Sequence, residues 1–364
     1  MSKQIVFVIN SIRNPRCIKR VNEFVDAGFR VKVYAFDRGG EMYNAQTDYA
    51  IHFVKGFSNN VSYLKRLPVI YHGVRSIVAE NKGSHAAFYL FGLDIAMLFV
   101  MVCPKEPFIY EESDLTHTYL PNRFLRRTFD WIDRYVIRRS LQTVFTSDGF
   151  RQYHFGDKFP ENCHVIPNRL SVSVKGYIIP PKDNHDNLRI GFVGHIRFRS
   201  VKSFVDTFCR NYPQNEFHFF GDFVSQRDED SFDSLKQYEN CHFHGTFQTP
   251  RDLPVIYSKI DLVLATYDVS FDNIRYAEPN KLYEAIYFET PIIVSEGCFL
   301  GDKVTELNVG YAVDALCAEQ VKALVSSLTQ ESIDGKIERM RTLGKDFAVN
   351  YNGDFFAKLN DILV

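Results

Sequence analysis

The sequence predicts an α/β protein with two doubly wound parallel sheets, one in each half of the chain. Short apolar segments rich in β-branched and aromatic residues alternate with helical segments, which is the pattern of parallel strands joined by right-handed crossovers. The alternation stops at a polar, proline-containing segment, residues 172–187, and then begins again. A chain of 364 residues is also long enough for two hydrophobic cores.

The first series begins with a strand at residues 5–10 (IVFVIN). The spacing of Ile18, Val21 and Phe24 predicts a helix from Pro15 that ends before Gly28. Further strands of this half are expected at residues 31–36, 86–91, 108–112, 143–147 and 164–168, with helices near 93–103 and 121–140.

The second series begins with LRIGFVG (188–194). Its further strands are expected at residues 216–222, 241–245, 261–266, 291–295 and 310–314, with helices near 201–211 and 279–288. We therefore expect an N-terminal domain (1–171), a linker (172–187), a C-terminal domain (188–340) and a helical segment (341–364) that packs back on the N-terminal domain. Ligands of such sheets bind beyond the carboxyl ends of the strands, so a cleft between the domains is the expected site.

Composition places the chain among folded proteins of a reducing compartment. It is 45% hydrophobic and 24% charged, and its apolar start, IVFVI, is too short for a signal peptide. The most apolar stretch, 88–103, is interrupted by Asp94 and is shorter than the ~20 residues of a membrane span, so we expect a buried helix there. Seven scattered cysteines without CxxC spacing indicate free thiols and the cytoplasm.

The two halves differ in charge. Residues 1–170 contain 23 Lys and Arg against 16 Asp and Glu, whereas the rest contains 20 against 28. The segment 121–141 contributes six arginines among Phe124, Phe129 and Trp131. This helix could contact an anionic membrane that holds a lipid-linked acceptor, or it could be a packed helix with a cationic outer face.

The segment YAEPNKLYEA (276–285) offers groups for a nucleotide. Pro279 is suited to the first turn of a helix, and Asn280, Lys281 and Glu284 then share one face near its amino end. Backbone N–H groups, the helix dipole and the lysine would favour a diphosphate, while Glu284 could accept hydrogen bonds from ribose hydroxyls. The alternative is that Lys281 and Glu284 form an exposed ion pair worth less than ~1 kcal/mol.

The sequence PNKLYEAIYFETPIIVS (279–295) resembles the P-x-K-x-x-E segment of glycosyltransferases of the large retaining family four. The resemblance implies the GT-B fold, in which two Rossmann-like domains face a cleft, and it implies that Glu284 binds the ribose. Glu278, Asn280 and Leu282 are then further nucleotide-sugar-binding residues. Weaker similarity to the family covers residues 11–36, 143–153, 164–171 and 244–268.

LRIGFVGHIRFRSVKSF (188–204) resembles the first strand and turn of the family's C-terminal domain. There a glycine turn precedes basic residues on the leaving diphosphate. The resemblance makes Gly194, His195 and Arg199 binding residues, and Arg197, Lys202 and Lys281 catalytic ones, although the register leaves open which cation serves. A solvated basic turn is the alternative.

Two departures from the family concern the carboxylates. The family often has a second glutamate eight positions before the ribose-binding one, where this chain has Tyr276. Many members also have a histidine where FIYEESDL (108–115) has Ser113. We take Glu112 and Asp114 as catalytic-cleft residues there, although such a pair could simply cap the next helix.

The resemblance implies a retaining hexosyltransferase that uses a UDP- or GDP-linked sugar and no metal ion or other cofactor. The acceptor would be a glycan or lipid-linked sugar of bacterial surface polysaccharide or capsule synthesis, with no nucleic-acid partner and with possible peripheral contact to the inner membrane. A sugar-nucleotide epimerase of the same fold and a catalytically silent sugar-nucleotide-binding partner protein are the alternatives.

Two further motifs are interpreted as having no role in catalysis. The acidic triplet 228–230 lies in a polar run and is expected to be a solvated loop, unlike the metal-binding triplet of other glycosyltransferases. Cys241, His242 and His244 lie on one strand, which cannot direct three adjacent groups at one ion, and no distant partner is evident. The turn after the first strand lacks GxGxxG, which argues against a dinucleotide oxidoreductase.

Overall fold

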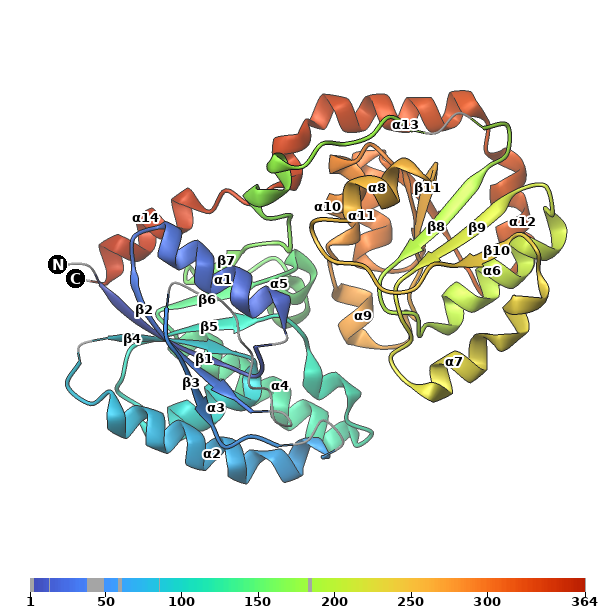
Figure 1. Ribbon diagram of the computed structural model, residues 1–364. Coiled ribbons are helices and arrows are strands. Elements are labelled where there is room, and N and C mark those ends of the chain that lie inside the picture. Colours follow the sequence, from blue (N-terminus) through green and yellow to red (C-terminus); the bar gives the residue numbers. More distant parts are fainter. Residues whose placement is uncertain are drawn as a thin grey trace. The chain divides into compact units, whose positions relative to one another are not determined.

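The chain divides into two compact units in a computed structural model that describes residues 3–12, 14–37, 49–57, 61–84, 86–182 and 185–363. Unit 1 consists of residues 1–167 together with 352–364, and unit 2 of residues 168–351. Figure 1 labels the helices and strands of both units. We describe each unit separately.

A parallel sheet of seven strands forms the centre of unit 1 within the described residues. Its order is β3-β2-β1-β4-β5-β6-β7, so the chain reverses direction across the sheet after β3. Phe7 of β1 pairs with Val33 on one side and Tyr89 on the other. The strands are β1 (Gln4–Ile9), β2 (Arg30–Phe36), β3 (Ile51–Val54), β4 (Ala87–Phe91), β5 (Phe108–Glu112), β6 (Gln142–Phe145) and β7 (Cys163–Val165).

Helices cover both faces of this sheet. Figure 1 shows α2, α3 and α4 on one face and α1 and α14 on the other. On the second face, Phe24 of α1 and Phe355 of α14 pack in one core with Phe7 and Tyr89 of the strands. The helices are α1 (Pro15–Asp26), α2 (Tyr63–Glu80), α3 (Leu93–Val102), η1 (Thr116–Tyr119), α4 (Arg123–Arg139), α5 (Asp148–Phe155) and α14 (Gly353–Ile362).

Unit 2 has a parallel sheet of six strands among its described residues, in the order β10-β9-β8-β11-β12-β13. Successive side chains alternate between two cores: Leu262 and Leu264 of β11 lie in one core, and Val263 and Ala265 lie in the other. Burial on both faces explains why these strands are apolar throughout. They are β8 (Arg189–Val193), β9 (Glu216–Phe220), β10 (Cys241–Phe243), β11 (Leu262–Ala265), β12 (Ile292–Ser295) and β13 (Gly310–Val313).

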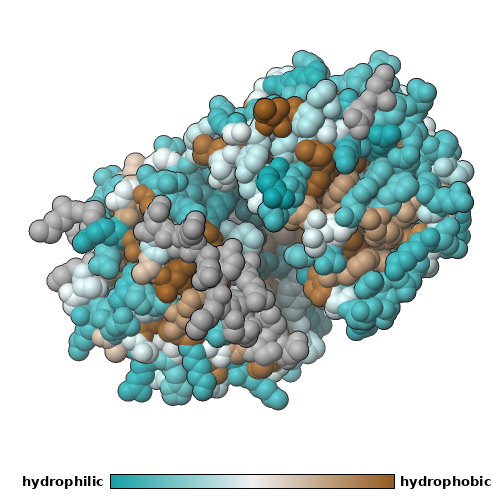
Figure 2. Space-filling model, in the orientation of Figure 1, coloured by the Kyte–Doolittle hydropathy of each residue, from teal (hydrophilic) through white to brown (hydrophobic). Residues whose placement is uncertain are grey.

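The helices of unit 2 also form two layers. One core receives side chains of α6, α7 and α12, and the other receives those of α8, α10 and α11. Figure 2 shows that hydrophilic residues cover most of the visible outer surface of this unit. The helices are η2 (Val172–Gly176), α6 (Arg199–Asn211), α7 (Gln226–Phe232), η3 (Asp233–Gln237), α8 (Leu253–Ser258), α9 (Asp272–Tyr276), α10 (Lys281–Tyr287), α11 (Phe299–Leu307), α12 (Ala318–Ser327), α13 (Gln330–Leu343) and η4 (Lys345–Ala348).

The predicted fold class, two doubly wound parallel sheets, is confirmed. The division between the units falls after Pro167 and again after Tyr351, so residues 168–171 and 341–351 belong to unit 2. The prediction of a loop at the acidic triplet was wrong, because residues 228–230 lie in α7, whose amino end is capped by Ser225.

The apolar stretch 88–103 forms most of β4 and then α3, which has ten residues and is largely buried. Across the described ranges, we find no helix with the length and hydrophobicity of a membrane span.

Candidate functional site

The loops after β8 and β9 lie in direct backbone contact at the carboxyl edge of the sheet in unit 2. Gly194, with φ +141°, donates its N–H to the carbonyl oxygen of Phe220 at 2.8 Å. An ideal Cβ on Gly221, which has φ +139°, would lie only 1.9 Å from the carbonyl oxygen of Gly194. Both positions therefore require glycine, because a side chain would be strained at Gly194 and would also collide at Gly221.

A buried carboxylate, Glu284, lies one turn into α10 and accepts hydrogen bonds from three residues. Lys281 Nζ donates to Oε2 at 2.6 Å, and Tyr257 OH donates to the same oxygen at 2.8 Å. Asn280 Nδ2 donates to Oε1. The Glu284 side chain is 1% exposed and that of Lys281 11%, so the alternative of a solvated surface ion pair is ruled out.

The side chain of Lys281, on α10, contacts the turn that follows β8. An ideal Cβ on Gly194 would lie 3.7 Å from Lys281 Cε, which is ordinary van der Waals contact. The glycine turn and the lysine, predicted from two motifs far apart in the sequence, are therefore adjacent in unit 2. A lysine ammonium, a glycine turn and a buried acceptor now lie at one sheet edge, where ligands of such folds bind.

The phenol of Tyr257 is held in its protonated, donating form. Burial, together with the Glu284 carboxylate, raises its pKa well above the usual value. Glu284 Oε2 already accepts two hydrogen bonds, whereas Oε1 accepts one, from Asn280. A carboxylate oxygen has two acceptor sites, so Oε1 retains capacity for a further donor such as a sugar hydroxyl.

The basic turn after Gly194 is exposed. His195, Arg197 and Arg199 lie at the surface and Lys202 is half-buried one turn into α6. The guanidinium of Arg197 lies 4.8 Å from the ring centroid of Phe198.

The amino end of α6 is already occupied by a carboxylate. Asp268 accepts from the backbone N–H groups of Arg199 at 3.2 Å and Ser200 at 2.9 Å. A phosphate could use these two N–H groups only if Asp268 moved away. The exposed Arg197 and Arg199, the half-buried Lys202, and Lys281 are the predicted cations that remain for an anionic ligand near the turn.

Glu278 does not join the Lys281 cluster. It is 4% exposed, and it accepts from Lys303 Nζ at 2.5 Å and from Tyr283 OH. Leu282 is 0% exposed and lies in the hydrophobic core. Its side chain is therefore turned away from any ligand, and its role as a binding residue stays a prediction.

The two carboxylates predicted in unit 1 have different environments. Glu112 is 1% exposed and lies 2.9 Å from His154 Nε2 through Oε1. Asp114 is exposed and lies 3.6 Å from Arg16 NH1 through Oδ2. Asp114 can meet a ligand directly, whereas Glu112 faces the interior of the unit.

Sequence reasoning missed three side chains that shape the site. Tyr257 lies in the segment 244–268. The resemblance of this segment to the family indicated a role near the nucleotide, but it did not indicate the hydrogen bond from Tyr257 to Glu284. Asp268 is the third residue after β11, and position just beyond the end of a strand was a usable signal. Lys303, on α11, gave none, because its approach to Glu278 depends on how α11 packs.

Two groups of described side chains have the composition and proximity of a metal site. One is Glu112, Asp133 and His154 in unit 1, and the other is Glu216, His218 and His242 in unit 2. The second corrects the sequence interpretation: β9 provides the partners of His242 that a single strand could not, because His242 and His218 are paired in register.

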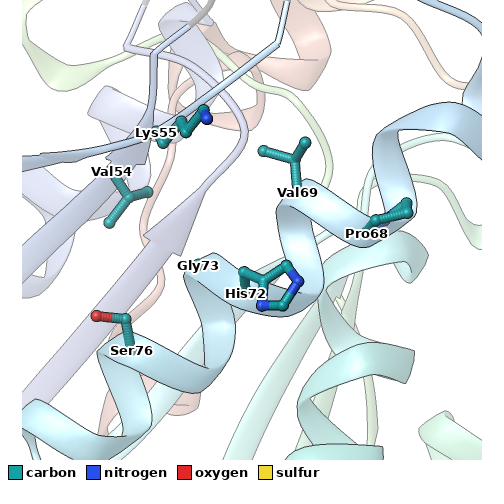
Figure 3. A pocket seen from close by; sticks show the side chains of 7 residues that line it. All are labelled: Val54, Lys55, Pro68, Val69, His72, Gly73 and Ser76. Atoms are coloured by element: carbon teal, nitrogen blue, oxygen red, sulfur yellow. The ribbon is translucent and has the colours of Figure 1, made fainter.

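A pocket in unit 1 lies apart from these residues. Figure 3 shows it between β3 and α2, with Val69, His72 and Ser76 of the helix facing Val54 and Lys55. None of the site residues predicted from the sequence lines it.

The sequence matches no protein-family model and no curated protein. Solved structures with similar folds nevertheless exist. Sucrose-phosphate synthase from Thermosynechococcus elongatus is 12% identical with a TM-score of 0.74, covering 99% of this chain and 98% of its own. HepE from Anabaena, solved with UDP and glucose, is 13% identical with a TM-score of 0.70 over the same shares.

A third similar structure is a putative UDP-N-acetylglucosamine 2-epimerase from Listeria monocytogenes. It is 14% identical, with a TM-score of 0.62, covering 98% of this chain and 94% of its own. These likenesses establish that the chain has the GT-B fold, with two doubly wound units. At such low identity they do not define its reaction.

Proposed function

We propose that the protein is a metal-independent, retaining glycosyltransferase that moves a hexose from a UDP- or GDP-linked donor to a glycan or lipid-linked acceptor. The observation that carries the proposal is the buried Lys281–Glu284 pair in contact with the Gly194 turn at the carboxyl edge of the unit 2 sheet. The similar fold of HepE, solved with UDP and glucose, supports the same donor class.

In the proposed binding mode, unit 2 holds the donor. The Lys281 ammonium and the exposed Arg197 and Arg199 would contact the diphosphate, while Glu284 Oε1 would accept from a ribose hydroxyl. Asn280 is half-buried beside that oxygen, so the ribose would approach over Asn280. Gly194 would let the backbone come close to the phosphates.

The proposed role of these residues is to stabilise the negative charge of the leaving diphosphate. As the glycosidic bond to the phosphate breaks, negative charge grows on the diphosphate and positive charge on the sugar. Fixed cations at the phosphates lower the energy of that state without being reorganised during the reaction. Retention of configuration, with the acceptor proton passing to the leaving phosphate, follows from the family resemblance.

In unit 1, the exposed Asp114 would contact the substrate. Glu112 would not, since it has almost no accessible surface and lies in the interior of the unit. In unit 2, Glu278 Oε2 has no hydrogen-bond partner within the described structure. It is a buried acceptor beside Lys303, and it is our candidate for contact with the donor sugar in place of the family glutamate that is replaced by Tyr276.

The epimerase remains the second candidate, because a putative 2-epimerase has a similar fold. Incubation of the pure protein with UDP- and GDP-sugars, followed by chromatography of the products, separates the alternatives. Slow release of free nucleotide supports transfer chemistry, and an isomeric sugar nucleotide supports epimerisation. Binding without any product would indicate a silent partner protein and contradict our proposal.

The acceptor side of the proposal includes contact with an anionic membrane. On α4, Phe124 and Trp131 are 76% and 68% exposed, and Arg123 and Arg127 are exposed beside them. Apolar and cationic side chains on one helix are the combination that binds anionic lipid surfaces.

Co-sedimentation with vesicles tests this contact. We expect binding to vesicles with phosphatidylglycerol, and loss of binding in Trp131→Ser with Arg127→Ser. Equal sedimentation of wild type and variant would contradict the proposal. The seven cysteines, all free thiols, support a reducing compartment such as the cytoplasm.

A further inference from the structure

A cluster of buried histidine and carboxylate side chains lies beyond the end of β5 in unit 1. Glu112 comes from β5, His117 from η1, Asp133 from α4 and His154 from α5. Each is at most 5% exposed. Four separate elements thus meet through side chains that are ordinary metal ligands.

The ligand atoms of three of these residues, Glu112, Asp133 and His154, all lie within 4.8 Å of one another. His154 Nε2 lies 2.9 Å from Glu112 Oε1 and 3.9 Å from Asp133 Oδ2. His117 Nδ1 lies 3.7 Å from the same oxygen of Asp133. A tetrahedral zinc ion with bonds of about 2.0 Å keeps its ligand atoms about 3.3 Å apart, so the observed separations lie on both sides of that value.

Neighbouring groups fix the orientation of the ligands. His117 Nε2 lies 2.7 Å from Asp130 Oδ1, so the Nε2–H tautomer donates there and Nδ1 carries a lone pair. Within the described ranges, His117 Nδ1 has no hydrogen-bond partner. Tyr153 OH donates to Asp130 and Tyr110 OH donates to Asp133 Oδ1. Metal-binding histidines usually donate their other ring N–H to a carboxylate, and metal-binding carboxylates usually accept a hydrogen bond from a neighbouring donor.

We propose that Glu112, Asp133 and His154, whose ligand atoms all lie within 4.8 Å of one another, bind one divalent transition-metal ion, with zinc the first expectation. His117, whose Nδ1 lies 3.7 Å from Asp133 Oδ2, would be the fourth ligand, so the ion would be a structural one that joins β5, η1, α4 and α5. It would not take part in the transfer reaction, whose proposed donor residues lie in unit 2.

The group of Glu216, His218 and His242 is the weaker candidate. His218 there already has two partners: His244 Nε2 lies 3.0 Å from its Nδ1, and Glu216 Oε2 lies 3.1 Å from its Nε2. Both ring nitrogens are therefore engaged. This group supplies the matched control for the proposal.

The test is the metal content of the purified full-length chain, measured by inductively coupled plasma mass spectrometry after removal of loosely bound ions with a weak chelator. We expect about one equivalent of a divalent transition metal in the wild type. The nearly isosteric Asp133→Asn, and His154→Gln, should lose at least four fifths of it. The control His242→Gln should keep it.

Cobalt substitution of the wild type provides a second measurement that does not depend on variants. Co²⁺ bound by four N and O ligands gives visible absorption bands much stronger than those of the hydrated ion. A metal-free protein whose melting temperature is unchanged by zinc would overturn the proposal. So would a metal lost only in His242→Gln, because it would place the ion at the group of Glu216, His218 and His242. Neither result would affect the proposed donor site.

Discussion

The pairing of Lys281 with Glu284 shows what a single sequence can and cannot specify. Their spacing predicted a shared helical face, and the structure places Lys281 Nζ 2.6 Å from Glu284 Oε2. Spacing could not tell an exposed pair from a buried one, because burial depends on α8, from which Tyr257 donates to Glu284. The same limit applies to Leu282, whose side chain faces the core.

The hydrogen-bond partner of Glu278 could not be predicted because it lies far away in the sequence. Its partner Lys303 is 25 positions away on α11, and no local pattern indicates that contact. Glu112 likewise bonds to His154, 42 positions away. Side chains that meet through tertiary packing are identified only when the packing is known.

His218 gives a prediction for the pH dependence of stability. Burial, followed by the charges of His242 and His244, lowers its pKa to about 4, against about 6.5 in an unfolded chain. Above pH 6.5 the ring is neutral in both states and contributes nothing. Between pH 6.5 and 4 only the unfolded state takes up the proton, so the free energy of unfolding should fall, by about 1–2 kcal/mol after allowance for solvent.

Urea unfolding at pH 7.5 and pH 4.5 measures this fall. The variant His218→Gln should show a smaller fall than the wild type, while His72→Gln, at an exposed position on α2, should behave like the wild type. Identical falls in all three proteins would show that His218 titrates normally in the folded state.

At the scale of elements, apolar runs located most strands well. Residues 108–112 and 188–194 were predicted as strands and form β5 and β8. The four-residue β3 and the helix α2, with Pro68 inside it, were not predicted. Short edge strands and a proline within a helix weaken the periodicity on which such predictions depend.

The contact between the loops that follow β8 and β9 leads to a second prediction, at Gly221. An added Cβ would lie 1.9 Å from a backbone oxygen of the β8 turn, and the φ of +139° is itself unfavourable for other residues. Gly221→Ala should therefore lower the free energy of unfolding by about 2 kcal/mol or more. Gly176→Ala, where no atom lies within 4 Å of the added carbon, is the control.

Thermal or urea unfolding of the two variants measures this loss of stability. Gly221→Ala should also bind nucleotide more weakly, because the added carbon displaces the Gly194 turn. If Gly221→Ala were as stable as Gly176→Ala, the two loops could not be in the contact described.

At the scale of the molecule, the end of the chain belongs to the unit in which the chain begins. Phe355 and Leu359 of α14 are 5% and 0% exposed in the core of unit 1. Phe355→Ala should cost about 3–4 kcal/mol, and the loss should be confined to unit 1, since α14 is part of that unit.

Hydrogen exchange followed by mass spectrometry resolves the two units. Peptides from β1 and β2 should exchange faster in Phe355→Ala, whereas those from β11 and β12 should not change. The reverse pattern should follow from Met340→Ala, a buried position of unit 2. Faster exchange in both units from either variant would mean that they do not have separate cores.

The central claim, that unit 2 binds a nucleoside diphosphate through Lys281, is tested most directly by calorimetric titration of UDP and GDP into three proteins. Wild type should bind one of them, Lys281→Met should bind it at least 10-fold more weakly, and Tyr257→Phe should bind it nearly as well as wild type. Tyr257→Phe also removes one donor from Glu284 but no positive charge. Equal affinity of wild type and Lys281→Met, or equal weakening in both variants, would contradict the claim.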